Sequence, residues 1–461
     1  MQIAKKIKEF LASVLVRIHR ATPKKKSLWV GAALVLVGAF IVFKVTLGIY
    51  HWVSTFDPKG MVLSMGTELK KDANGYTNIV LLGDGGHVRD GADLVDTIIV
   101  ASIDFANGTV SMLSIPRDYY LKSSEFGTHK INELYRNFKK EMGDSAYSMF
   151  AKAGSEITEL DIPYYARIDF NAFVEVVDSL GGITVDVKEP IYDPYYPNEQ
   201  DDGYTVFEIK AGVQEMNGET ALKFSRSRKT TSDFSRALRQ QQVIMAIKEK
   251  AMSNNVLTNP SVLKKLYDAI QKNLNTNLSL TEMITLASLG QKIDRSRLVT
   301  KVLHDDPTQE GGFLVTPERQ YTNNQFALVP IGDNLDMIHQ YSDLIFHHRD
   351  IFLNPARIEV LNGTKAPGVA RALADRLKRF GFNVVNIDNL TDKAGNRKNV
   401  DKSFIRYNSW EVDKDGNVLP HFKSTIEALS GFVKGEAVPS DELLTDALAD
   451  LSVVVGADTT K

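Results

Sequence analysis

Basic side chains gather in the segment KFSRSRKTTSDFSRALRQQQ, residues 223–242, whose only acid is Asp233. The cations are Lys223, Arg226, Arg228, Lys229, Arg236 and Arg239. Arginine outnumbers lysine, which favours a bidentate grip on phosphate oxygens over a simple point charge. The whole chain has 55 Lys and Arg against 57 Asp and Glu, a net charge of −2, so this charge is a local feature. These residue types indicate a site for an oxyanion, and a solvated charged surface is the alternative.

The local sequence pattern places these cations on two different secondary-structure elements. The alternation in ALKFSRSR predicts an extended segment that turns Phe224, Arg226 and Arg228 to one face. The residues after it predict a helix capped by Ser232 or Asp233. Three of its side chains share a face at helical spacing: Arg236, Arg239 and Gln240. A cation in the first turn is repelled by the helix dipole unless an anion lies beside it, which again favours a bound anion.

Carboxylates supply the second kind of chemistry. Asp84 ends one predicted strand and Asp96 opens the next, so both acids can meet at one edge of a sheet. Such a pair can hold Mg²⁺ against phosphate oxygens or accept a proton from an attacking hydroxyl. Aspartates at strand ends also serve as turn and capping residues, which is the structural alternative. In SIPRD, Arg117 and Asp118 follow a proline-fixed turn, where a buried ion pair is the alternative to a catalytic role.

Strands and helices interleave around these residues. TNIVLLGD is a strand run, and two more runs within residues 96–115 are joined by the hairpin signal Asn107-Gly108. Helices are predicted at 131–142 and 145–160, followed by strand, helix and strand within 164–187. This order predicts an α/β (α+β) fold with a mixed sheet flanked by helices. Residues 189–204, EPIYDPYYPNEQDDGY, are predicted to form a long loop because they contain so many prolines and turn formers.

The N-terminal part predicts a membrane anchor. Residues 28–53 form an apolar run with one charge, Lys44, which fits one transmembrane helix better than a cleaved signal peptide. The preceding segment is rich in Lys and Arg, which places it in the cytoplasm and the bulk of the chain outside. Nucleic acid is a poor partner there, and the absence of cysteine suits that compartment. The expected localisation is the cell membrane, single-pass, with membrane lipid as a partner.

The C-terminal part predicts a small βαβ-type domain. From Arg357 a strand, a helix and a second strand follow one another, with no nucleophile and base set, so we expect binding or scaffolding there. The expected organisation has six parts: a cytoplasmic basic segment 1–27, a transmembrane helix 28–53, a linker 54–73, a catalytic domain 74–255, a helical extension and linker 256–350, and a C-terminal domain 355–461.

An ordered set of motifs resembles the LytR-CpsA-Psr (LCP) family. The set is NIVLLGDGG, VDTIIVASID, VSMLSIPRDYY, HKINELY, YYARIDFNAFVEVVDSLGGITVDV, MNGETALKFSRSRK and DFSRALRQQQ, over about residues 74–252. RIEVLNGTKAPGVARALADRLKRFGFNVV and DLSVVVGAD resemble the LytR C-terminal domain. One departure is that Leu94-Val95 precede Asp96 where many members have Arg-Ser, and Arg89 comes late in the first loop.

The resemblance implies an extracytoplasmic phosphotransferase. It would move a glycopolymer, such as teichoic acid or capsule, from a polyprenyl-pyrophosphate carrier to a peptidoglycan sugar hydroxyl. The family's catalytic positions match Asp84, Asp96 and Arg117, and its Mg²⁺ (or Mn²⁺) positions match Asp84 and Asp96. Its pyrophosphate-binding positions match Arg226, Arg228, Arg236, Arg239, Gln240 and Lys130.

Several alternatives remain open at this level. Either aspartate can act as the base or as the metal ligand. A non-catalytic binder of lipid-linked or anionic wall polymer would use the same arginines without needing the acids. A regulatory attenuator, as the family name suggests, would require nucleic acid and the opposite topology. A pyrophosphatase side activity on the carrier is compatible with the main prediction.

Overall fold

The computed structural model describes residues 68–84, 93–198, 203–227, 233–251, 253, 274–290, 293, 295–392, 394–407, 411–412, 418–419, 422–440 and 449–460. The predicted basic segment 1–27 and the predicted helix 28–53 lie outside these ranges, as do Arg89 and Arg228. Within them, no helix combines the length and the apolar character that a bilayer crossing requires.

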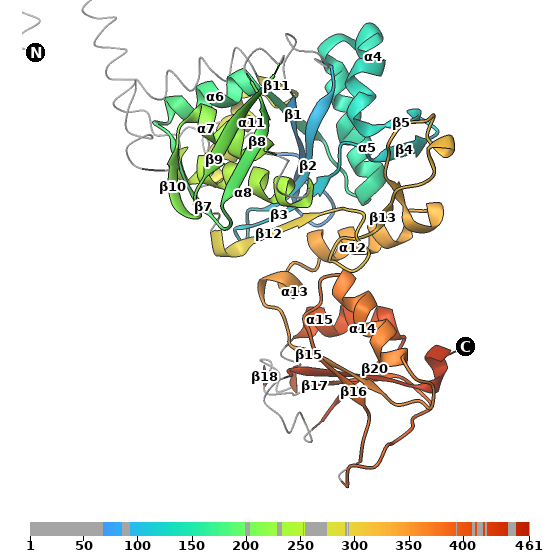
Figure 1. Ribbon diagram of the computed structural model, residues 1–461. Coiled ribbons are helices and arrows are strands. Elements are labelled where there is room, and N and C mark those ends of the chain that lie inside the picture. Colours follow the sequence, from blue (N-terminus) through green and yellow to red (C-terminus); the bar gives the residue numbers. More distant parts are fainter. Residues whose placement is uncertain are drawn as a thin grey trace, which may run out of the picture. The chain divides into compact units, whose positions relative to one another are not determined.

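A six-stranded mixed sheet forms the centre of the first part of the chain (Figure 1). Its order is β11 (Leu274–Thr276), β6 (Tyr164–Asp169), β1 (Thr77–Asp84), β2 (Val95–Asp104), β3 (Thr109–Ile115) and β12 (Leu298–Val302). The β1–β2 and β2–β3 pairs are antiparallel, whereas β1–β6 and β3–β12 are parallel. The predicted mixed sheet is confirmed. It also takes in β11 and β12, which lie beyond residue 255, where the catalytic domain was expected to end.

Alternating side chains bury both faces of this sheet. Val80, Val100 and Leu113 pack in a core with residues of α5 (Ser148–Thr158) and α12 (Asp336–Phe346). Ile99 and Met112 face the other way, toward α8 (Asp233–Ala251) and α11 (Leu280–Gly290). Strands buried on both sides explain the nearly continuous apolar runs in the sequence. The remaining short elements on the first face are η1 (Ile131–Glu133), α4 (Leu134–Met142) and η2 (Gly143–Tyr147).

A second group of elements surrounds α8. It contains α6 (Phe170–Ser179), α7 (Gly218–Arg226) and two antiparallel pairs, β7 (Ile183–Val187) with β10 (Gly212–Met216) and β8 (Ile191–Pro197) with β9 (Tyr204–Ile209). These elements share one hydrophobic core that includes Val177, Phe224 and Val243. Two further short pairs are β4 (Tyr120–Ser123) with β5 (Gly127–Lys130), and β13 (Leu314–Val315) with β14 (Val329–Pro330).

Two local predictions are wrong. The predicted loop 189–204 contains strand β8 and the first residue of β9, because a register shift between Asp193 and Tyr196 accommodates Pro194 within the pairing. The segment ALKFSRSR, predicted to be extended, is helical as far as Arg226, where α7 ends. Its N-cap, Asn217, accepts a hydrogen bond from the backbone N–H of Thr220, and this capping outweighs the short alternation.

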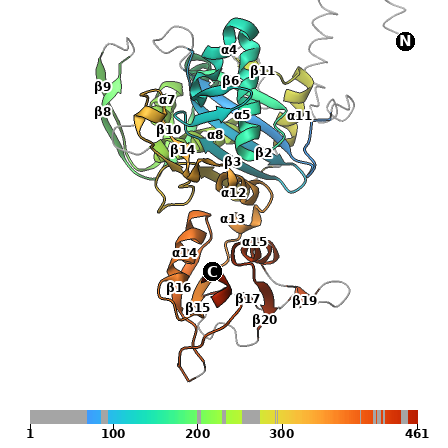
Figure 2. The same ribbon diagram turned by 90° about the vertical axis from the view of Figure 1, so that its right-hand side faces the viewer.

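The C-terminal part has a five-stranded sheet of its own, in the order β16 (Val384–Asn389), β15 (Ile358–Asn362), β21 (Leu451–Val455), β17 (Phe404–Tyr407) and β20 (Glu436–Pro439). Strands β15 and β16 are parallel and joined through α14 (Val369–Arg379), which confirms the predicted βαβ unit. A second helix, α15 (Lys423–Val433), packs on this sheet near α13 (Asp350–Leu353), as Figure 2 also shows.

Candidate functional site

Three hollows meet at the ends of β2, β3 and α8. The acidic cavity, of about 210 Å³, is lined by residues that include Asp96, Asp118, Asp305, Asp306, Gln309 and Phe326. The tyrosine cavity, of about 280 Å³, is lined by residues that include Phe170, Asp193, Tyr195, Tyr196, Tyr204 and Arg226. The apolar cleft, also about 280 Å³, is lined by residues that include Leu82, Ile99, Phe173, Val176, Val243 and Ile247.

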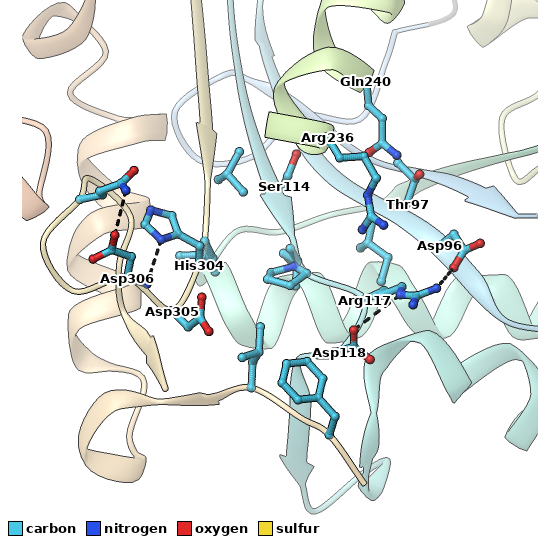
Figure 3. A pocket seen from close by; sticks show the side chains of 18 residues that line it. Asp96, Thr97, Ser114, Arg117, Asp118, Arg236, Gln240, His304, Asp305 and Asp306 are labelled. Atoms are coloured by element: carbon cyan, nitrogen blue, oxygen red, sulfur yellow. Dashed lines mark hydrogen bonds and ion pairs between the residues drawn. The ribbon is translucent and has the colours of Figure 1, made fainter. Parts of the chain in front are cut away.

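The three hollows share part of their walls. Thr97 and Gln240 line all three of them. Asp96, Arg117 and Arg236 line both the acidic cavity and the tyrosine cavity. Five residues from β2, α8 and the turn after β3 therefore form one junction, which Figure 3 shows from the side of the acidic cavity. Four of these five, all but Thr97, match positions that the family resemblance implied to be catalytic or pyrophosphate-binding.

Asp96 lies at a β-bulge. Gly83 of β1 pairs with Thr97 and the next residue, Asp84, pairs with Val95, so Asp96 is the extra residue of β2. Bulges redirect side chains at the ends of strands. The Asp96 carboxylate accepts a hydrogen bond from Arg117 Nη1 at 2.5 Å and keeps 32% of its side chain exposed. It is therefore a carboxylate that a substrate can reach.

Asp84 has a different environment. Its side chain is buried, and its carboxylate accepts hydrogen bonds from Arg167 Nε at 2.7 Å and Nη2 at 2.5 Å. The Tyr147 hydroxyl donates to the same carboxylate at 3.1 Å. Burial and the neighbouring Asp84 carboxylate raise the pKa of Tyr147, so this phenol keeps its proton. The structure thus brings Asp84 to the same sheet edge as Asp96, but not among the residues that line the three hollows.

Arg226 spans two of the hollows. It lines both the tyrosine cavity and the apolar cleft, and its Nη1 donates to the Tyr196 hydroxyl at 3.3 Å. Its guanidinium lies over the Phe170 ring, 4.1 Å from the centroid. Stacking of this kind fixes the plane of the guanidinium and leaves its edges available for oxyanions. Arg226 can therefore bind an anion at the boundary between polar and apolar walls.

Arg236 and Arg239 occupy one helix but have different surroundings. Arg236 lines the junction, whereas Arg239 lies behind it and donates from Nε to the Phe224 carbonyl at 2.8 Å and from Nη2 to the Ser227 carbonyl. These bonds satisfy carbonyls at the C-terminal end of α7. Burial, reinforced by Arg236, lowers the pKa of Arg239 to about 10. The effect of Arg236 on Arg239 shows that the two guanidinium groups repel each other beside the junction.

Lys130 does not line any of the three hollows. Its Nζ donates to Asp118 Oδ1 at 2.9 Å, and Asp118 lines the acidic cavity, with its other oxygen 3.6 Å from Arg117 Nε. Lys130, Asp118, Arg117 and Asp96 form a chain of alternating charges that ends at the junction. Lys130 is thus placed to position Arg117 through Asp118.

Sequence reasoning missed several residues of these walls. No local sequence pattern identifies Arg167 as part of the site, because its partner Asp84 is 83 residues away. The tyrosines of β8 and β9 had a sequence signal, because four of them occur within residues 192–204. The loop prediction for this segment did not use that cluster. Most of the missed residues of the acidic cavity come from residues 302–328, the segment that follows the pairing of β12 with β3.

A divalent metal ion has few protein ligands available here. Among the residues that the structure describes, no group of three or more His, Asp or Glu side chains is placed to hold a metal ion. The Asp84 carboxylate accepts bonds from Arg167 and Tyr147, whereas Asp96 is partly exposed. The donor set fits Mg²⁺ only as an ion held by Asp96 together with oxygens from substrate phosphate and water.

Comparisons with known proteins give the same two-part division. A model of the LytR_cpsA_psr family matches residues 54–327, and one described as LytR cell envelope-related transcriptional attenuator matches residues 356–458. The cell wall biosynthesis protein LcpA of Corynebacterium glutamicum is 24% identical over 363 residues, which cover 72% of this chain and 67% of LcpA.

Other relatives have names that state an activity. The polyisoprenyl-teichoic acid–peptidoglycan teichoic acid transferase TagU of Oceanobacillus iheyensis is 33% identical over 221 residues, 47% of this chain and 62% of TagU. The TagU of Bacillus licheniformis is 28% identical over 308 residues, 64% of this chain and 92% of that protein. A crystal structure of Bacillus subtilis TagV aligns with a TM-score of 0.46 at 24% identity, over 61% of this chain and 99% of that one.

Proposed function

Since the chain belongs to the LytR-CpsA-Psr family, we propose that it transfers a glycopolymer from a polyprenyl-pyrophosphate carrier to a peptidoglycan hydroxyl. The observation that carries this proposal is the junction at Thr97 and Gln240, where an arginine-containing cavity, an apolar cleft and an acidic cavity meet. A lipid-linked pyrophosphate sugar has three chemically distinct parts, and the three hollows match them: apolar chain, anionic centre and hydroxylated glycan.

The apolar cleft suits the lipid of the donor. Its walls come from β1, β2, β6, α6 and α8, and its polar end is formed by Arg226 and Gln240. Burial of an isoprenoid chain there is favourable by about 25 cal/mol for each Å² of apolar surface removed from water. With the chain in the cleft, the pyrophosphate would lie against Arg226 and Arg236. The sugar would then enter the tyrosine cavity, where aromatic rings can stack on it.

The chemistry needs one proton transfer and charge stabilisation. The acceptor oxygen attacks the phosphorus that carries the glycan, a new P–O bond forms, and the bond to the bridging oxygen breaks to release polyprenyl phosphate. Asp96 takes the hydroxyl proton, and the arginines stabilise the charge on the transferring and leaving phosphates. Asp84 does not contact the substrate in this proposal. It holds Arg167 at the same edge of the sheet.

Magnesium is part of the proposal: one oxygen of Asp96 would hold the ion, and the other would accept the hydroxyl proton. When bound, the ion would neutralise phosphate charge and lower the cost of bringing a hydroxyl oxygen to phosphorus. Arg117 pairs with Asp96 and would move toward a phosphate oxygen if the carboxylate turned to the ion. We also propose single-pass anchoring with the described part of the chain outside the cell, since the sequence pattern of residues 1–53 favours it.

A transfer assay tests this function. The full-length chain in detergent is incubated with a synthetic polyprenyl-pyrophosphate glycan and peptidoglycan fragments, with and without Mg²⁺, and compared with Asp96→Ala. Metal-dependent product from the unchanged chain and none from the folded variant would support a transferase. Equal lipid binding by both proteins with no product from either, across several donors, would indicate a receptor for wall polymer.

A further inference from the structure

The acidic cavity has a wall unlike those of the other two hollows. On the side away from the junction it is lined by His304, Asp305, Asp306 and Gln309 of one loop, and by Phe326. In Figure 3 the loop residues lie across the cavity from Arg236, Arg117 and Asp96. The carboxylates on this wall repel a phosphate or pyrophosphate group. The wall is therefore unsuited to the anionic part of the donor.

The loop is built to hold its shape. The backbone N–H of Asp306 donates to His304 Nδ1 at 3.1 Å, so His304 carries its proton on Nε2 and donates it to the Glu310 carbonyl at 2.7 Å. The Asp306 carboxylate accepts bonds from Thr308 and from Gln309 within the same turn. At Gly312 a Cβ would lie 1.8 Å from the Asp306 carbonyl oxygen, so no larger residue fits there. His304 and Asp306 thus serve the loop itself.

Two side chains of this wall remain suited to contact a ligand. Asp305 is exposed, and Figure 3 shows its carboxylate on the cavity side of the loop. Phe326 is 47% exposed, which is unusual for a large apolar side chain beside a cavity. A carboxylate that accepts hydrogen bonds and an aromatic face are the two groups that recognise the hydroxyls and the C–H face of a sugar ring.

The C-terminal domain supports this wall. The N–H of Gly311 donates to the Arg379 carbonyl at 3.0 Å, and Arg379 Nε donates to the Pro307 carbonyl at 2.8 Å. Glu310 pairs with Lys301 of β12 at 2.5 Å and lies so close to Gly381 that a Cβ there would be 2.4 Å from Oε1. Behind these contacts the rings of Phe313 and Phe380 have centroids 4.7 Å apart. The end of α14 therefore fixes the loop that carries Asp305.

We propose that the acidic cavity is the subsite for the acceptor saccharide, with Asp305 and Phe326 as its recognition residues and the C-terminal domain as the support of its wall. This assignment rests on the proposed transferase function. The hydroxyl that attacks would enter from this cavity, while the donor phosphate lies on the arginine side of the same junction. Asp96, which lines both cavities, is then placed to take the proton from the acceptor hydroxyl while that oxygen attacks the phosphorus.

The test separates acceptor binding from transfer. Full-length Asp305→Asn and Phe326→Ala are compared with the unchanged chain, with Asp375→Asn and Tyr321→Ala as controls. Asp375 and Tyr321 are also exposed and do not line the cavity. Calorimetry measures binding of a soluble, uncross-linked peptidoglycan strand, and the transfer assay measures the KM of acceptor and donor separately. Thermal unfolding verifies that each variant is folded.

We expect the Kd and the acceptor KM to rise about tenfold in both cavity variants, a change of about 1.4 kcal/mol, with donor KM unchanged and the controls at the original values. Unchanged strand affinity in both folded variants would overturn the subsite while leaving the transferase proposal intact. No transfer by any form, with strand binding still lost in the cavity variants, would support the subsite and count against the transferase.

Discussion

Arg167 and Asp84 form a bidentate ion pair in which both side chains are almost completely buried. The pair joins the C-terminal ends of β1 and β6, and Arg167 also lies 3.4 Å from Asp169 at the end of β6. Burial disfavours the charged form of Arg167, but the hydrogen bonds and the negative charge of Asp84 outweigh it, so the pKa of Arg167 is raised. This pair fixes the sheet edge from which Asp96 projects.

We predict that removing one partner is costly. Arg167→Met should lower the free energy of unfolding by about 3–5 kcal/mol, because it leaves the Asp84 carboxylate buried without a counter-charge. The double variant Asp84→Leu/Arg167→Met should recover much of that loss, since no charge stays buried. Denaturant unfolding of both proteins measures this, and equal losses in the single and double variants would argue against the pair as the cause.

Arg226 gives a prediction about anion binding. Arg226→Lys keeps the charge but loses the planar stack on Phe170 and the bond to Tyr196. We expect affinity for inorganic pyrophosphate to fall about tenfold, since lysine cannot reproduce bidentate binding. Arg319→Lys, at an exposed site away from the hollows, is the matched control. If calorimetry gives the same pyrophosphate affinity for all three proteins, Arg226 is not part of the anion site.

Much of the scaffold was predictable, because local patterns determine it. The β2–β3 hairpin follows from Asn107-Gly108, and the helix that carries Arg236 follows from the predicted cap at Ser232 or Asp233. The hairpin β8–β9 was not predictable from composition, since a bulge accommodates its proline. The wall that carries Asp305 depends on the pairing of β3 with β12 at separations near 190 residues, and no local pattern reports such a contact.

Alkaline pH should weaken the fold through its buried phenols. Burial, together with a hydrogen bond to Glu282, raises the pKa of Tyr164 to about 12 from its ordinary value of 10. Because the folded state holds this proton more tightly, its stabilising contribution is complete below pH 10 and is lost as pH rises toward 12. Tyr164→Phe should therefore reduce the decline in unfolding free energy between about pH 10 and 11.5. An unchanged slope would mean that Tyr164 does not titrate in this way.

Gly381 tests the support of the loop by the C-terminal domain. It has φ of +87°, and a Cβ would meet Glu310 and Phe352 at 2.4 and 2.6 Å. Gly381→Ala should cost about 1–3 kcal/mol of stability and raise the acceptor KM more than the donor KM. Gly431→Ala is the control, because that glycine lies in α15 with open space around it and should gain up to about 1 kcal/mol. Equal effects on both KM values would indicate general destabilisation only.

The most direct test of the central claim is a crystal structure of the full-length chain with a donor analogue whose pyrophosphate bridge is a methylene group. We predict that the phosphonates lie within hydrogen-bond distance of Arg226 and Arg236, with the isoprenoid chain in the apolar cleft between Phe173 and Ile247. An analogue bound with its phosphonates away from Thr97 and Gln240, or with its lipid on another surface, would contradict the assignment of this junction as the reaction centre.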